Sequence, residues 1–154
     1  MQRISNCILI DQNKILLVKK PRRGWYAIPG GKMEQGETIK ESAMREYGEE
    51  TALRLNDPRL AGVFTFSIYD NEKLVDEWMM FTFMAVAFDG ELTEHCNEGI
   101  LEWVDKTKIN ETPMAEGDRE IFKHVLSGSG ILYGSFSYTE DFELLSMRFD
   151  TSPL

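Results

Sequence analysis

The chain has 154 residues, 42% of them hydrophobic, which fits one globular domain, residues 1–154, with a core of its own. Its formal net charge of −9 disfavours non-specific binding to duplex nucleic acid and to anionic membranes. No signal segment and no apolar run of membrane-spanning length stand out, and Cys7 and Cys96 form no disulfide framework. We therefore expect a cytoplasmic protein with free thiols.

The chain opens with two apolar segments that we expect to pair as a hairpin. Residues 3–10 and 15–18 are the strands, and the polar residues between them form the turn. A basic cluster follows, which includes Lys20 and Arg23. In isolation such a cluster is a solubilising loop, but beside an acidic helix in an acidic protein it can bind substrate phosphates. Both interpretations stay open, and Arg23 is the first choice for a phosphate contact, ahead of Lys20.

A glycine segment and a helix come next. Residues 25–28 predict a short aromatic-rich strand that leads into Gly30 and Gly31, where the backbone can approach a ligand closely. Thr38 and Glu41 form a capping-box pair, which predicts that a helix begins at this point.

Three carboxylates of this helix are spaced to share one face. Glu46, Glu49 and Glu50 stand at i, i+3 and i+4, and like charges at this spacing destabilise a helix by about 0.2–0.5 kcal/mol per pair. A hard cation such as Mg²⁺ or Mn²⁺ would compensate, because such ions take carboxylate oxygens and bridge them to phosphates. The alternative is a solvated acidic helix face, which is the usual meaning of such a run when it stands alone.

The glycine segment and the helix together carry a longer spaced pattern. It resembles the Nudix box, G-x5-E-x7-R-E-U-x-E-E-x-G-U, in which U is a bulky apolar residue. Tyr47 stands where an aliphatic residue is usual and can fill the same core position. Ala52 replaces a glycine, at a cost of about 1–2 kcal/mol if the backbone there is left-handed. The positions that match are Gly31, Glu37, Arg45, Glu46, Glu49, Glu50 and Leu53.

The resemblance implies a Nudix fold of the α+β kind, in which a mixed β-sheet is sandwiched between helices as an α/β/α sandwich. It also implies a Mg²⁺ or Mn²⁺ cofactor. The ligands that it implies on the box are the carbonyl of Gly31 and the carboxylates of Glu46, Glu49 and Glu50.

In MutT-like members of the family, a loop glutamate supplies a further metal ligand or the catalytic base. Glu98 is the nearest match, and Glu94 and Glu102 compete with it. Either Glu46 or Glu98 would then orient or deprotonate the attacking water. Arg45 would position a glutamate rather than contact the substrate.

The rest of the chain predicts further strands and one more helix. The long apolar segment 77–88 predicts a strand in the centre of the sheet. Asp118 leads the expected second helix. The other strands are expected at 60–69, 100–104, 131–138 and 142–149, the last two as a hairpin.

Outside the box, the chain is loosely similar to the 8-oxo-dGTP diphosphatases of the MutT type. In one human enzyme of that type, an acidic pair and an asparagine read the oxidised base beside a stacking tryptophan. Asp118 matches one member of the pair, whereas the other three positions fall at Gly117, Ala27 and Ala115. The candidates to take their place are Tyr26, Asn6 and Trp103.

The resemblance therefore implies a Mg²⁺-dependent pyrophosphohydrolase that cleaves a nucleoside triphosphate, first of all 8-oxo-dGTP, to the monophosphate and pyrophosphate. Phosphoryl transfer needs positioning and charge neutralisation, so a carboxylate cage with metal suffices without a covalent nucleophile. A hydrolase of another nucleoside diphosphate compound, such as a nucleotide sugar, ADP-ribose or a capped RNA end, is the nearest alternative. A nucleotide sensor without turnover is the other alternative, and the complete carboxylate set argues against it.

Overall fold

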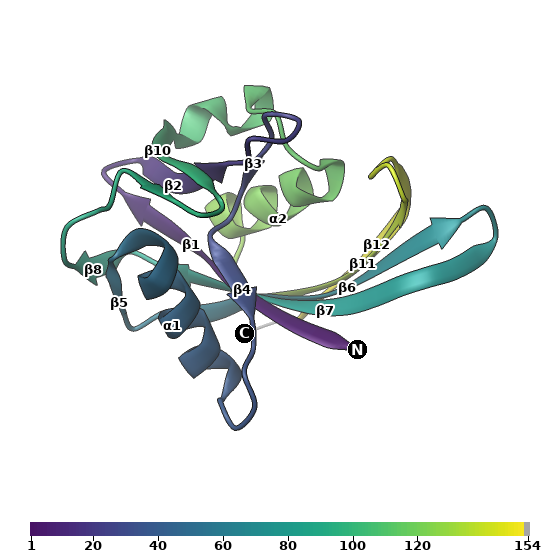
Figure 1. Cartoon of the computed structure of the whole chain (residues 1–154), viewed down its shortest axis with the longest axis horizontal. Coiled ribbons are helices and arrows are strands. Elements are labelled where there is room, and N and C mark those ends of the chain that lie inside the picture. Colours follow the sequence, from purple (N-terminus) through teal and green to yellow (C-terminus); the bar gives the residue numbers. More distant parts are fainter. Residues whose placement is uncertain (153–154) are drawn as a thin grey trace.

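The computed structural model describes residues 1–152, apart from the side chains of His95, Thr151 and Ser152 (Figure 1). Its main sheet follows the path β12-β11-β6-β7-β1-β2-β10-β9, and β3 and β4 branch from β2 and β1. β5 and β8 form a separate two-stranded sheet. The elements are β1 (Gln2–Asp11), β2 (Lys14–Lys19), β3 (Tyr26–Ala27), β4 (Gly30–Lys32), α1 (Ile39–Thr51), β5 (Arg54–Asn56), β6 (Arg59–Asp70), β7 (Lys73–Ala85), β8 (Ala87–Asp89), β9 (His95–Cys96), β10 (Gly99–Asp105), the 3₁₀-helix η1 (Lys106–Glu111), α2 (Glu116–Ser127), β11 (Ile131–Thr139) and β12 (Leu144–Ser152).

The main sheet is mixed, as predicted. β1 runs parallel to β7 and β6 runs parallel to β11, while the other paired strands are antiparallel. β7 lies between β6 and β1, so the long apolar strand is central. Because successive side chains of a strand point to opposite faces, Met80 of β7 packs into one core cluster and Phe83 into the other.

Helices cover both faces of the sheet, which confirms the expected sandwich (Figure 1). Ala43 and Tyr47 of α1 pack into the cluster on one face. Ile121 and Phe122 of α2 pack into the cluster on the other. Tyr47 is fully buried, so the aromatic ring does fill the core position expected of it. None of the helices in the described part of the chain is long and apolar enough to cross a membrane.

The two ends of α1 are fixed by local chemistry. Thr38 Oγ1 accepts a hydrogen bond of 3.1 Å from the Glu41 N–H, and Glu41 Oε1 accepts one of 2.7 Å from the Thr38 N–H, so the capping box is confirmed. At the other end Ala52 has a φ of 67° and donates its N–H to the carbonyl of Gly48. The helix thus ends in a left-handed residue, and an alanine bears the strain that a glycine would avoid.

Several boundaries and elements differ from the prediction. β7 begins at Lys73 rather than at 77 and ends at Ala85, because its exposed first residues extend the hairpin with β6 beyond the core. Gly30 and Gly31 are part of a short strand, β4, paired with β1. Asp118 does not lead the second helix: α2 begins at Glu116, with Ala115 as its N-cap. The 3₁₀-helix η1 was not predicted.

Candidate active site

A close contact between β4 and α1 forms one end of the site. Gly31 on β4 pairs with Ser5 on β1, and Ser5 Oγ shares a buried hydrogen bond of 2.8 Å with Ser42 Oγ on α1. This bond ties the helix to the strand. A Cβ atom at Gly31 would overlap the carboxylate of Glu46. The missing side chain at Gly31 therefore allows the Glu46 carboxylate to lie against the backbone of β4.

Arg45 links three of the box glutamates. Its Nε and Nη2 donate to the two carboxylate oxygens of Glu37 at 2.6 and 2.9 Å, and its Nη1 donates to Glu46 at 2.9 Å and to Glu49 at 3.3 Å. Nη2 also donates to the Lys32 carbonyl at 3.0 Å. The Arg45 hydrogen bonds are the main reason why the pKa of Glu37 falls to about 2. This geometry agrees with the predicted role of Arg45 as a positioning residue.

Glu50 is the buried carboxylate of the box, with 9% of its surface exposed. Its Oε2 accepts a hydrogen bond of 3.3 Å from the Gly30 N–H, the one hydrogen bond to this side chain in the described part of the chain. Burial raises the pKa of Glu50 to about 7, and Glu98 and Glu46 add to the rise while Lys20 opposes it. A second positive charge at this place would stabilise the ionised carboxylate.

Glu98 and Lys20 lie beside two neighbouring strands and act on Glu50 through their charges. Glu98 lies in the turn between β9 and β10, and Lys20 directly follows β2. Lys20 Nζ donates to Glu98 Oε2 at 2.8 Å. Since β10 pairs with β2, the sheet brings these two residues together although they are far apart in sequence. Both charges act on the pKa of Glu50, so the loop glutamate Glu98 lies close enough to the box to influence it.

The acidic residues suit a hard divalent ion in their chemistry. All the donors are carboxylate or carbonyl oxygens, which Mg²⁺ and Mn²⁺ prefer, and Glu50 has no ion pair with a described residue. Within residues 1–152, however, no three acidic, His or Cys side chains are gathered in metal-binding geometry. Glu46 and Glu49 are bound to Arg45 instead, and the Glu49 side chain is 59% exposed. The groups that could hold a metal are the Gly31 carbonyl and the carboxylates of Glu46, Glu49, Glu50 and Glu98.

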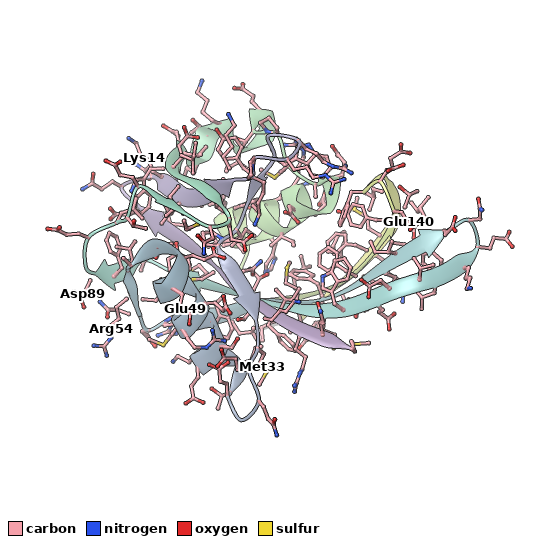
Figure 2. All side chains as sticks on the ribbon, viewed as in Figure 1. Lys14, Met33, Glu49, Arg54, Asp89 and Glu140 are labelled. Carbon is pink, nitrogen blue, oxygen red and sulfur yellow. The ribbon has the colours of Figure 1, made fainter. Side chains whose placement is uncertain are left out.

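A pocket of about 540 Å³ begins beside Glu98. Its walls come from the loop after β2, the start of α2 and the turn between β11 and β12, where Figure 2 labels Glu140. Lys20, Arg22 and Arg23 add positive charges to this lining, and Glu98, Asp118 and Glu140 add carboxylates. The pocket is lined by all four of the predicted substrate-binding residues, which are Lys20, Arg23, Tyr26 and Asp118.

Asp118 lies half-buried in the first turn of α2, and burial raises its pKa to about 7. The position before it cannot carry the second acid of the resemblance. A Cβ at Gly117 would lie 2.5 Å from the Tyr138 hydroxyl and 2.6 Å from the ring of Phe136. The Gly117 N–H instead donates to Tyr138 Oη at 2.7 Å. The glycine is therefore required by the packing of α2 on β11.

The three residues proposed as substitutes for the missing base contacts lie in different surroundings. Tyr26 lines the pocket, but its hydroxyl bonds to Glu102, which raises the pKa of the phenol. Asn6 is only 6% exposed and donates Nδ2 to the sulfur of Met80 at 3.2 Å. Trp103 packs beside Phe88, with ring centroids 6.0 Å apart. Of the three, only Tyr26 is among the residues described as lining the pocket.

Two aromatic residues of the pocket were missed by the sequence reasoning. Trp25 and Phe142 both line it, from the loop after β2 and from the turn before β12. Each had been placed at the start of a predicted strand. The available signal was a large aromatic ring next to a turn, where burial in the core is not expected.

A mixed sheet between helices, with an arginine that links three glutamates of the box beside a pocket, is the arrangement expected of a Nudix hydrolase. The NUDIX domain description matches residues 1–125, and the chain belongs to this family. The predicted family and fold are therefore confirmed.

The chain is similar to proteins of two Bacillus species over nearly its whole length. It is 49% identical over 150 residues to the "Uncharacterized Nudix hydrolase YvcI" of Bacillus subtilis (strain 168), which spans 97% of this chain and 95% of that protein. The crystal structure of a MutT protein from Bacillus halodurans is 52% identical, with a TM-score of 0.95 over 99% of this chain and 100% of that one. A shorter match, 44% identical over 61 residues, joins it to the ADP-ribose pyrophosphatase of Methanocaldococcus jannaschii, over 38% of this chain and 36% of that protein.

Proposed function

We propose that the protein is a Mg²⁺-dependent pyrophosphohydrolase that converts a nucleoside triphosphate, first of all 8-oxo-dGTP, to the monophosphate and pyrophosphate. The observation that carries this proposal is the continuity of the site. Glu98 and Lys20 act on the pKa of the box residue Glu50 and also line the pocket, which continues past Arg23 to Asp118. A nucleoside triphosphate needs positive groups around its phosphates and a recess for its base. This pocket has both.

Each residue then has a role that its position supports. Bound Mg²⁺ or Mn²⁺ would neutralise charge on the phosphoryl oxygens. Glu46 or Glu98 accepts a proton from the attacking water. Arg45 keeps Glu46 in place through its hydrogen bond of 2.9 Å. Lys20 exchanges the Glu98 carboxylate for a phosphate oxygen when the substrate enters.

The choice of an oxidised purine rests on Asp118. With a pKa of about 7, its carboxyl group is partly protonated at neutral pH, so it can donate or accept a hydrogen bond at the edge of a purine. Tyr26 lines the same pocket. Because the packing at Gly117 excludes an acid at that position, Asp118 is the carboxyl group of α2 in this pocket that would distinguish the oxidised base.

Hydrolysis of ADP-ribose is the second candidate. The observation in its favour is the match to the archaeal ADP-ribose pyrophosphatase, which is 44% identical over 61 residues. The same carboxylates would act on the diphosphate of ADP-ribose, and the difference between the two candidates lies in what the pocket holds beyond the phosphates.

A substrate panel with Mg²⁺ tests the proposal. We expect pyrophosphate release from 8-oxo-dGTP with a higher kcat/KM than from dGTP, ADP-ribose or a capped RNA end. Glu50→Gln should abolish turnover while circular dichroism shows a retained fold, and Glu72→Gln in the exposed turn after β6 serves as the matched control. A preference for ADP-ribose would replace the substrate assignment. Nucleotide binding without any product would favour the sensor.

The cytoplasmic location stays a prediction.

A further inference from the structure

The guanidinium group of Arg23 rests against two aromatic rings of the pocket. Its Cζ lies 5.1 Å from the ring centroid of Trp25 and 5.9 Å from that of Phe142. Guanidinium is planar and stacks on aromatic faces. Both rings line the 540 Å³ pocket. The flat group that they hold inside it is the protein's own Arg23 guanidinium.

The two segments that meet here both have unusual backbones. Arg23 has a φ of 70° and Phe142 a φ of 60°. Left-handed conformations are common at glycine and asparagine in turns, but they are rare for bulky side chains. Strain of this kind gathers at ligand clamps, where surrounding contacts maintain it. Because both partners of the Arg23–Phe142 contact carry this strain, we infer that these segments bind a ligand rather than only connect strands.

Arg23 is held by interactions that a nucleotide can replace. Nη1 donates to the carbonyl oxygen of Asp141 at 2.6 Å. No carboxylate within residues 1–152 forms an ion pair with this guanidinium, although Glu140 lines the same pocket. A phosphate would offer two charged acceptors to the guanidinium in place of one neutral carbonyl, which is a stronger interaction.

We propose that Trp25 and Phe142 form the seat of the nucleobase, and that Arg23 occupies this seat until the base displaces it and the guanidinium moves to a phosphate. The proposal deepens the proposed function, because it rests on a nucleotide as the ligand. It also explains how the pocket holds a flat ring although Ala115 stands at the position of the stacking tryptophan. The stacking surface comes from two other segments of the chain.

Equilibrium binding of nucleoside monophosphates in EDTA tests the seat without turnover. We expect Trp25→Leu and Phe142→Leu each to raise the Kd of dGMP and 8-oxo-dGMP by about tenfold, the size of one lost base-stacking contact. Trp25→Phe keeps a ring and should retain most of the affinity. Tyr133→Leu is the matched control, because Tyr133 is an exposed aromatic residue of β11 outside this pocket.

Inorganic triphosphate, which has no base, separates a seat for the base from a general loss of binding. Its Kd should stay within about twofold in both leucine variants. Equal weakening of triphosphate and dGMP binding, or an unchanged Kd for dGMP in folded Trp25→Leu and Phe142→Leu, would overturn the seat.

The two proposals fail separately. If nothing is hydrolysed but the variants bind dGMP poorly, the seat stands without the hydrolase; if KM is unchanged in both variants, only the hydrolase stands.

Discussion

Gly31 determines where the Glu46 carboxylate can lie. Gly31→Ala places a methyl group on that carboxylate, so Glu46 has to move away from β4. Gly31 is not among the residues with a positive φ, so alanine is otherwise compatible with the backbone and the fold should persist. We expect kcat to fall by about 10–100-fold, the cost typical of disturbing groups that orient a metal site. The measurement is kcat alongside thermal unfolding.

Gly48→Ala is the control for this change. A Cβ at Gly48 would lie 3.6 Å from the Leu53 carbonyl, which is an ordinary contact. This variant should keep kcat and should raise stability by about 0.5–1 kcal/mol, because alanine is the better helix residue. An unchanged kcat in Gly31→Ala would show that this contact does not hold Glu46.

The hydrogen bonds between Arg45 and Glu37 make the protein sensitive to acid. The pKa of Glu37 is about 2 in the folded state, below the usual value of 4.5 for a glutamate. A lowered pKa of this kind stabilises the fold fully above pH 4.5, and the stabilisation is lost as the pH falls from 4.5 towards 2. Glu37→Gln should therefore be less stable than the parent at pH 7, and the difference should shrink over this range.

Urea denaturation at several pH values measures this effect. The midpoints of the parent and of Glu37→Gln should converge in acid, whereas Glu72→Gln in the exposed turn before β7 should follow the parent throughout. A gap that stays constant from pH 7 to about pH 3 would show that the ionised form of Glu37 is not the stabilising one.

Among the elements, α1 carries a strain at its end that a single change can relieve. Ala52 has a φ of 67°, a conformation that glycine adopts at little cost. Ala52→Gly should raise the free energy of unfolding by about 1 kcal/mol, after allowance for the greater freedom of glycine in the unfolded chain. Chemical denaturation measures it.

Ala87→Gly is the matched control for the helix end. Ala87 is exposed in β8 and is not among the residues with a positive φ. The same substitution there should destabilise by about 0.5–1 kcal/mol, because glycine only adds freedom to the unfolded chain. If both variants lose stability, the left-handed end of α1 is not strained.

Elements that depend on local chemistry could be predicted from the sequence, and those that depend on distant partners could not. The start of α1 follows from Thr38 and Glu41, which meet across a single turn. The strand at Gly30 exists because β1 supplies its partner, which no local pattern reveals. The start of α2 at Glu116 has no side-chain cap to announce it. Asp118 was recognised as a functional candidate, but it was predicted to begin the helix, whereas it lies in the first turn of a helix that begins at Glu116.

At the scale of the whole molecule, the same distinction divides the candidate site. The box is one continuous segment, so Glu46, Glu49 and Glu50 were recognised as a group. The pocket is assembled from the loop after β2, the turn before β10, the start of α2 and the turn before β12. Trp25 and Phe142 become neighbours of one guanidinium only after the sheet has formed. The substrate end of the site therefore needed the folded chain.

A divalent cation can stabilise the whole molecule, whose net charge is −9, in two ways. Any salt screens the mutual repulsion of its carboxylates, whereas only a specific site binds the folded state with an affinity of its own. At a free Mg²⁺ concentration of about 100 times Kd, a specific site adds about 2.7 kcal/mol, which raises Tm by about 5–10 °C for a chain of this length. Glu50→Gln should reduce the Mg²⁺ effect to that of NaCl at equal ionic strength, while Glu72→Gln should keep it, and EDTA should reverse it. Equal shifts of Tm in MgCl₂ and NaCl for the parent protein would mean that Mg²⁺ only screens charge and that the box carboxylates hold no metal in the absence of substrate.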